Sequence, residues 1–140
     1  LLLDVTPLSL GIETMGGLME VLVPRNSKVP TQVGRQYTTH VDGQSSMRIS
    51  VYQGERDLVK DNRKLAEFNL TGIPGMPAGL PKVDIQFLLN ADGILVVKAK
   101  ELRSGVEQII DVQLNDTEKA AFAKSADAVR AMNADLKSVL

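Results

Sequence analysis

Short runs of alternating apolar and polar residues, separated by turn-forming residues, fill the chain from about residue 8 to residue 114. In SMRISVYQ, for example, Met47, Ile49 and Val51 are apolar and the residues between them are polar. Successive side chains of a β-strand point to opposite faces, so this pattern predicts strands with one buried and one solvated face. About eight such runs at this spacing predict an antiparallel β-sandwich.

The turns between these runs are marked by their residues. The sequence NADG at 90–93 strongly predicts the turn of a β-hairpin, because Asp and Gly lie between two apolar runs. GIPGMPAGLP at 72–81 holds three prolines and three glycines, which predict a loop between two strands. The strands are expected at SLGIE, LMEVLV, the segment around RQYTTH, SMRISVYQ, LAEFNL, KVDIQFLL, ILVVKAKE and VEQIIDVQL.

Two acidic turns are expected to have structural roles only. Asp42, in the turn sequence DGQ, is expected to accept a hydrogen bond from its own local backbone as an Asx turn. Glu55 and Asp57 lie close to Arg56 and Lys60, which is typical of a solvated charged turn.

Residues 115–140 differ in composition, since they lack Gly and Pro and are rich in Ala. Asn115 and Glu118 resemble a helix-capping box. The apolar residues fall on one helical stripe formed by Phe122, Val129, Met132 and Leu136. The predicted fold class is therefore mainly β, with an antiparallel sandwich of about eight strands followed by one C-terminal α-helix.

The composition argues against several classes of function. Sixteen basic and seventeen acidic residues give a net charge of −1, which does not favour nucleic acid or acidic membranes as partners. The chain has no cysteine and one histidine, His40, so thiolate or histidine metal sites are not expected. No run approaches the ~20 apolar residues of a membrane helix. No nucleophile lies beside a base, so we expect neither an enzyme nor a catalytic residue.

What remains is a binding surface around two turns. Met15 lies on the turn TMGG, and Met47 follows the turn in HVDGQSS. Methionine is flexible and polarizable, so two such turns on neighbouring strands could close over varied apolar side chains. Alternatively, both methionines fill gaps in the core, and the residues alone do not separate these two interpretations.

Several longer motifs occur in a fixed order: LLLDVTPLSLGIETMGG, PRNSKVPT, VYQGER, FNLTGIP and NADGILVVKAKE with SGVEQ. From Leu1 to about Val112 they strongly resemble the substrate-binding domain of the DnaK-type heat-shock chaperones of about seventy kilodaltons. The resemblance implies a groove that holds extended apolar segments of unfolded or client polypeptides. It also implies a linker remnant at 1–4 (Leu1, Leu2, Leu3 and Asp4), a peptide-binding sandwich at 5–114 and a C-terminal helix at 115–140 that forms part of a lid.

The resemblance further implies partners outside this chain. The family's ATPase domain, which binds ATP and Mg, would precede the linker, so this chain is expected to hold no cofactor of its own. That domain and a J-domain co-chaperone are the expected partners beside the client. The absence of a signal peptide and of cysteines favours a cytoplasmic location, and a mitochondrial matrix protein would look the same after loss of its transit peptide.

Ten residues receive roles from the resemblance. Met15 and His40 would form an arch over the backbone of the guest peptide. The central pocket would be lined by Leu10, Ile12, Met47 and Ile49, with Tyr37 and Thr38 along its rim. Hydrogen bonds to the guest main chain would be made near Thr14, Thr38 and Gln44.

The chain also departs from the common pattern of the family. Many members carry a small residue where His40 stands, and Ala78 replaces an arginine that latches the lid. Together with PRN and GIPGMPAG, this favours the HscA-like branch, whose clients are iron–sulfur cluster scaffold proteins. Two alternatives stay open: a dedicated module for such a scaffold protein, and a structural sandwich whose groove is filled by its own tail or by the tail of another copy.

Overall fold

The structure, a computed structural model, describes residues 3–114 of the chain. It confirms the eight predicted strands and adds one short 3₁₀ helix. Leu1, Leu2 and the expected helix at 115–140 lie outside the described residues. The elements are β1 (Leu10–Thr14), β2 (Leu18–Val23), β3 (Thr31–Thr38), β4 (Ser46–Gln53), η1 (Val59–Asp61), β5 (Arg63–Thr71), β6 (Lys82–Leu89), β7 (Ile94–Glu101) and β8 (Glu107–Gln113).

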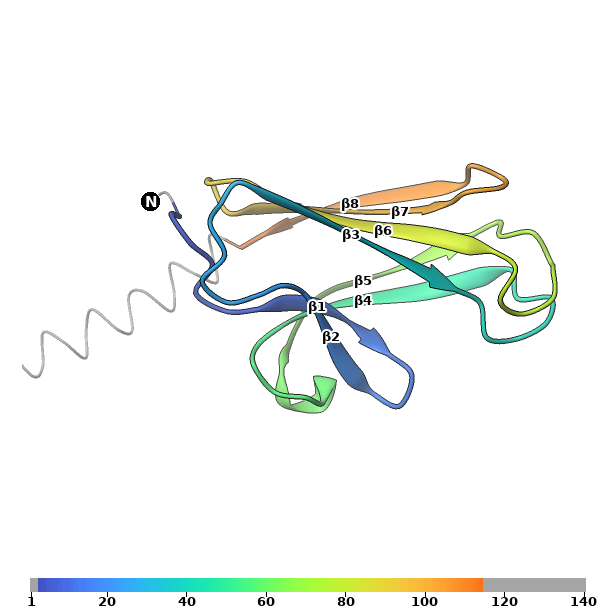
Figure 1. Cartoon of the computed structure of the whole chain (residues 1–140), viewed down its shortest axis with the longest axis horizontal. Helices are drawn as coiled ribbons and strands as arrows, with labels where there is room; N and C mark the ends of the chain where they lie inside the picture. Colours follow the sequence, from blue (N-terminus) through green and yellow to red (C-terminus); the bar gives the residue numbers. More distant parts are fainter. Residues whose placement is uncertain (1–2, 115–140) are drawn as a thin grey trace, which may run out of the picture.

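The strands form two four-stranded sheets that pack face to face (Figure 1). One sheet has the order β2-β1-β4-β5 and the other the order β3-β6-β7-β8. Every pair of neighbouring strands is antiparallel, as the alternation predicts. The mainly β, antiparallel fold class is therefore confirmed for the described residues.

The core lies between the two sheets and follows the alternation of the sequence. On β6 the residues at 83, 85, 87 and 89 are buried, while those between them are partly exposed. Phe87, the largest fully buried side chain, has no exposed surface. Burying a large apolar side chain is worth roughly 1.5–3 kcal/mol, so these inner faces supply most of the driving force that holds the sheets together.

Strands β1 and β4 pair over only part of their length. Their ladder runs from Leu10–Gln53 to Ile12–Val51 and ends there. Beyond that pair, β1 stays with β2 as far as Thr14, and β4 stays with β5 as far as Ser46. Figure 1 shows the β1–β2 hairpin turning away from β4 and β5. One sheet is thus split at one end, and among residues 3–114 the facing edges of β1 and β4 have no strand partner there.

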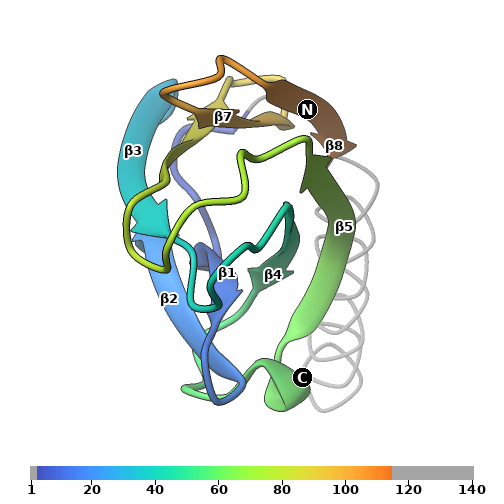
Figure 2. The same cartoon turned by 90° about the vertical axis from the view of Figure 1, so that its right-hand side faces the viewer.

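The loops at the split end lie close together. The loop after β3 and the Pro- and Gly-rich segment 72–81 run side by side in both Figure 1 and Figure 2. Asp42 does not form the expected local Asx turn, because its carboxylate accepts a hydrogen bond from the backbone N–H of Ala78 (2.8 Å). Glu55 is also more than a solvated turn residue, since it accepts hydrogen bonds from the N–H and hydroxyl of Ser9 (2.9 and 2.6 Å).

At the other end of the sandwich, the hairpin at 90–93 is confirmed. The side chain of Asn90 accepts hydrogen bonds from the N–H groups of Asp92 and Ile94, both at 3.0 Å. Both ends of the described chain meet this hairpin, because the N–H groups of Leu3 and Leu114 donate to Ala91 and Gly93, each at 2.8 Å. Within residues 3–114, no helix has the length and apolar character needed to cross a membrane.

Candidate functional site

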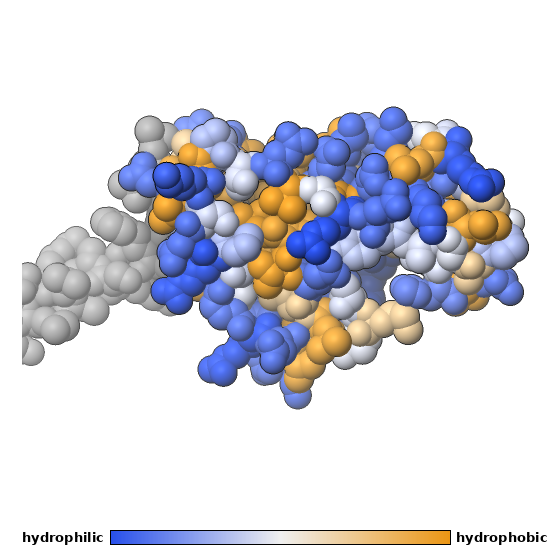
Figure 3. All heavy atoms as spheres, in the orientation of Figure 1, coloured by the Kyte–Doolittle hydropathy of each residue, from blue (hydrophilic) through white to orange (hydrophobic). Residues whose placement is uncertain are grey.

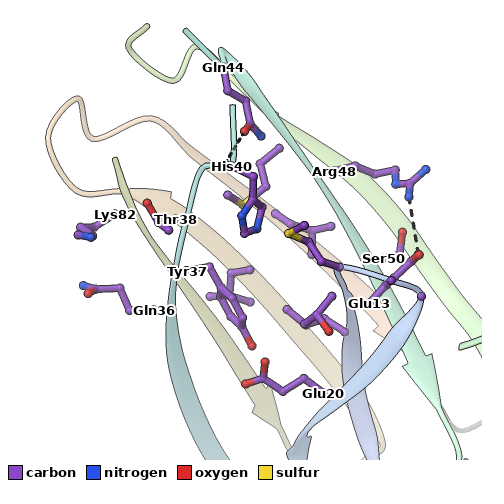
Figure 4. A pocket seen from close by; sticks show the side chains of 18 residues that line it. Glu13, Glu20, Gln36, Tyr37, Thr38, His40, Gln44, Arg48, Ser50 and Lys82 are labelled. Atoms are coloured by element: carbon purple, nitrogen blue, oxygen red, sulfur yellow. Dashed lines mark hydrogen bonds and ion pairs between the residues drawn. The ribbon is translucent and has the colours of Figure 1, made fainter. Parts of the chain in front are cut away.

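A groove with a volume of about 910 Å³ opens where β1 and β4 separate. Its walls come from β1, the turn after it, β2, β3, the loop after β3, β4 and the start of β6. Figure 3 shows the surface hollowed between the β1–β2 hairpin and the loop after β3. The close view in Figure 4 shows side chains from both sheets converging on this space.

Nine of the ten residues assigned by resemblance line this groove, although they come from separate stretches of the chain. The exception is Leu10, which is 1% exposed and lies in the core below the groove. The nine lining residues are Ile12, Thr14, Met15, Tyr37, Thr38, His40, Gln44, Met47 and Ile49.

The floor of the groove is apolar and rigid. Ile12 and Ile49 are 4% and 2% exposed and belong to the main core cluster. Met47 is half-buried and packs against the same cluster. Ile85, on β6 of the opposite sheet, also lines the groove. A guest side chain entering here would meet a surface already fixed by core packing, so little ordering would be needed on binding.

Met15 and His40 lie at the mouth of the groove. Met15 is 68% exposed on the turn between β1 and β2, where Gly16 and Gly17 adopt positive φ values of 82° and 72°. Such φ values favour glycine, which explains the paired glycines of the motif. The exposure of Met15 contradicts the alternative that it fills a gap in the core. Met47, in contrast, both packs on the core and lines the groove.

The loop that carries His40 is held by the amide of Gln44. The backbone N–H of His40 donates to Gln44 Oε1 (3.0 Å, Figure 4), and Gln44 Nε2 donates to the carbonyl of Ser46 (2.8 Å). The hydroxyls of Thr38 and Thr14 likewise donate to backbone carbonyls of Pro81 and Leu18. These side chains therefore already have partners within the protein, and the free edges of β1 and β4 are the better source of hydrogen bonds to a guest main chain.

Charged residues at the groove were not predicted from the sequence. Arg48 Nη2 lies 3.7 Å from Glu13 Oε1 on the far side of the groove (Figure 4). Glu20 pairs with Arg35 at 3.2 Å, and Lys82 Nζ donates to the carbonyl of Gly79 at 2.7 Å. These contacts depend on strand register and on the split between β1 and β4, which the alternation pattern does not specify.

Tyr37 places a buried polar atom in the groove wall. Its hydroxyl has no hydrogen-bond partner among the described residues and points toward Glu20 (Figure 4). Burial, and then the negative charge of Glu20, raise the pKa of the Tyr37 phenol well above its usual value. The hydroxyl therefore stays protonated at neutral pH and remains a hydrogen-bond donor in the groove wall, directed toward the carboxylate of Glu20.

The lining of the groove is partly apolar and partly polar. Among residues 3–114, no three His, Asp or Glu side chains come together in a way that could hold a metal ion. Among the described residues, the groove combines an apolar floor, two strand edges without a partner strand and the exposed side chain of Met15 at its mouth, a combination suited to an extended apolar chain.

The sequence matches the Hsp70 protein family over residues 1–138. Among curated relatives, it is similar to the protein named "Chaperone protein HscA homolog" of Pseudomonas aeruginosa, at 54% identity over 90% of this chain and 21% of the relative. The protein of that name in Janthinobacterium sp. is 51% identical over 96% of this chain and 23% of the relative. The chain thus spans about a fifth of the length of the curated relatives it matches.

Proposed function

Because this chain belongs to the Hsp70 protein family, we propose that it forms the part of an Hsp70-family chaperone that holds extended apolar segments of client polypeptides. The observation that carries the proposal is the split between β1 and β4 beyond the pair Ile12–Val51. The split supplies two unpaired strand edges directly above an apolar floor. Unpaired edges bind an extended chain through its main chain, whatever its sequence.

The groove also supplies a modest preference for apolar guests. One guest side chain resting on Ile49 and Met47 would be removed from water, which is worth roughly 1.5–3 kcal/mol for a Val, Leu, Ile, Phe or Met. That energy separates apolar from polar segments without committing the site to one sequence. Met15, flexible and exposed at the mouth, can adapt to guests of different size.

The chain spans about a fifth of the length of its curated relatives, so the other functions of such a chaperone would belong to segments outside this chain. We propose that an ATPase domain, with ATP and Mg, and a J-domain co-chaperone regulate guest exchange, and that the protein works in the cytoplasm. This chain would then bind without catalysing a reaction. Family membership supports the chaperone role itself.

A narrower client range is the second candidate. The similarity to proteins named HscA homologs favours the HscA-like branch, as do Ala78 and the segments PRN and GIPGMPAG. Under this second proposal, the client is an iron–sulfur cluster scaffold protein. A scaffold-derived segment would then bind far more tightly than unrelated apolar segments, whereas a general chaperone would bind both with similar affinity.

The proposal is tested by fluorescence anisotropy with labelled heptapeptides. Apolar heptapeptides should give saturable titrations, and a polar heptapeptide of the same length should not. Flat titrations across several apolar sequences would contradict the proposal. If binding appeared only after removal of residues 115–140, the groove would instead be occupied by the chain's own tail.

A further inference from the structure

Met15 is the most accessible methionine among residues 3–114. It is 68% exposed on the turn between β1 and β2. The turn projects into open space, since a side-chain carbon added to either of its glycines would meet nothing within 4 Å outside its neighbours in the chain. The other described methionines are partly buried: Met19, Met47 and Met76. A small molecule in solution can therefore reach the sulfur of Met15 more easily than the other three.

The three partly buried methionines are also protected by their contacts. Asn62 Nδ2 lies 2.9 Å from the sulfur of Met19, and Arg103 Nη1 lies 3.7 Å from the sulfur of Met76. Met47 packs against the main core cluster. No hydrogen-bond donor within residues 3–114 lies on the sulfur of Met15. Because oxidation of a thioether uses a lone pair of the sulfur, Met15 is the least protected of the described methionines.

The 140 residues contain no cysteine, so no thiol of this chain competes for an oxidant. A peroxide converts the methionine thioether to a sulfoxide. The sulfur lone pair attacks one oxygen of hydrogen peroxide, so that an S–O bond forms and the O–O bond breaks. The proton on the transferred oxygen passes to the departing hydroxide, which leaves as water. The sulfur is oxidised, the peroxide is reduced, and no further reactant is needed.

We infer that Met15 is an oxidation site for peroxides, and that its sulfoxide weakens the binding of apolar guests. The inference rests on the proposed function. Met15 lines the mouth of the groove whose floor includes Met47 and Ile49. Its apolar side chain can cover a guest at no cost in lost hydration, whereas a sulfoxide oxygen must give up water to do so. Met15 lies outside the core cluster, so its oxidation changes the groove and leaves the packing of the sandwich intact.

The first test needs no guest. The guest-free protein is treated with dilute hydrogen peroxide, and its peptides are followed over time by mass spectrometry. One oxygen atom should be added to Met15 well before Met19, Met47 or Met76. Oxidation of Met47 or Met76 at the same rate as Met15 would overturn the inference.

The second test compares the affinity for a labelled apolar heptapeptide before and after peroxide treatment. Oxidised wild type should show about a tenfold higher dissociation constant, and treatment with methionine sulfoxide reductases A and B should restore the original value. Met15→Leu keeps an apolar side chain of similar volume and should bind equally well before and after peroxide. Met76→Leu is the matched control and should lose affinity on oxidation as the wild type does.

Two results of the second test would overturn the inference: unchanged affinity of the oxidised wild type, or an equal loss of affinity in peroxide-treated Met15→Leu. The two tests also separate the inference from the proposed function. If the untreated wild type bound no apolar peptide, the proposed function would fail, and mass spectrometry would still decide whether Met15 is the preferred site of oxidation.

Discussion

Glu13 and Arg48 face each other across the point where β1 and β4 separate, with 3.7 Å between Glu13 Oε1 and Arg48 Nη2. The same guanidinium lies 3.9 Å from Glu67 on β5. Among the ion pairs of the described residues, the pair with Glu13 alone joins β1 to β4 beyond the end of their ladder. It therefore spans the split on which the proposed function depends.

Breaking this pair should make the groove easier to open. Exposed ion pairs contribute about 0.2–1 kcal/mol, so Arg48→Gln is expected to speed dissociation of a labelled heptapeptide by up to about fivefold at low salt. The difference should shrink as salt is raised, because screening weakens the pair in the wild type. Lys98→Gln, which removes the Lys98–Glu107 pair (3.4 Å) from the other sheet, is the control. Equal salt dependence in Arg48→Gln and Lys98→Gln would rule out this role.

Filling the floor of the groove should weaken binding. Met47→Trp adds bulk where a guest side chain would rest, and overpacking of this kind costs about 1–3 kcal/mol. That cost corresponds to roughly a 5- to 150-fold higher dissociation constant in the anisotropy titration. Ile109→Trp changes a half-exposed residue on the outer face of β8 and should leave the affinity unchanged. Unchanged affinity in Met47→Trp would show that the guest side chain lies elsewhere.

Removing the unpartnered hydroxyl of Tyr37 should not destabilise the domain. An unsatisfied buried hydroxyl costs about 1–3 kcal/mol, so Tyr37→Phe is expected to keep or raise the free energy of unfolding by about 1 kcal/mol in a urea titration. A loss of stability greater than about 1 kcal/mol would mean that the hydroxyl has a partner in the folded protein.

The same residue predicts how stability depends on alkaline pH. The pKa of Tyr37 is raised in the folded protein, so its phenol is protonated there at pH values where it ionises in the unfolded chain. The contribution of the protonated phenol to the free energy of unfolding is therefore complete below pH 10 and is lost as the pH rises above that value. Tyr37→Phe should show a shallower decline of the unfolding free energy above pH 10, and an identical decline in both proteins would contradict the assignment.

The lowered pKa of Glu101 predicts that the stability of the domain falls at acid pH. Burial by itself raises the pKa of this carboxyl, but hydrogen bonds from the hydroxyl and N–H of Ser104 and from the N–H of Arg103 outweigh it and hold the pKa below its usual value. A lowered pKa contributes stability above pH 4.5 that is lost as the pH falls through the folded-state value. Glu101→Gln should flatten this acid decline in thermal unfolding, and an unaltered decline would refute the assignment.

The strands could be predicted because the pattern of residue types within each strand is sufficient to identify it. In Val83 to Leu89 the alternation of buried and part-exposed side chains follows the residue types one by one. Asn90 and Gly93 mark the hairpin through local chemistry alone. The role of Asp42 could not be read in this way, because its partner Ala78 lies 36 residues further along the chain.

The site was predictable only in part, and for a different reason. Family resemblance named Ile12, Met15 and Ile49, and all three line the groove. The charged residues Glu13 and Arg48 were missed, since their contact exists only because two strands separate at a given register. Leu10 shares the inner face of β1 with Ile12, but it lies at the end of the β1–β4 ladder away from the split and is therefore covered by the core.

The most direct measurement is the set of intermolecular NOEs between a bound apolar heptapeptide and the methyl groups of the domain. The account predicts contacts from one guest side chain to Met47 and Ile49, and from the guest backbone to Met15. Methyl groups on the outer face of the β3-β6-β7-β8 sheet, such as that of Ile109, should show none. Contacts to Ile109 without contacts to Met47, or contacts from residues 115–140 to Met47 in place of the peptide, would contradict the proposed guest site.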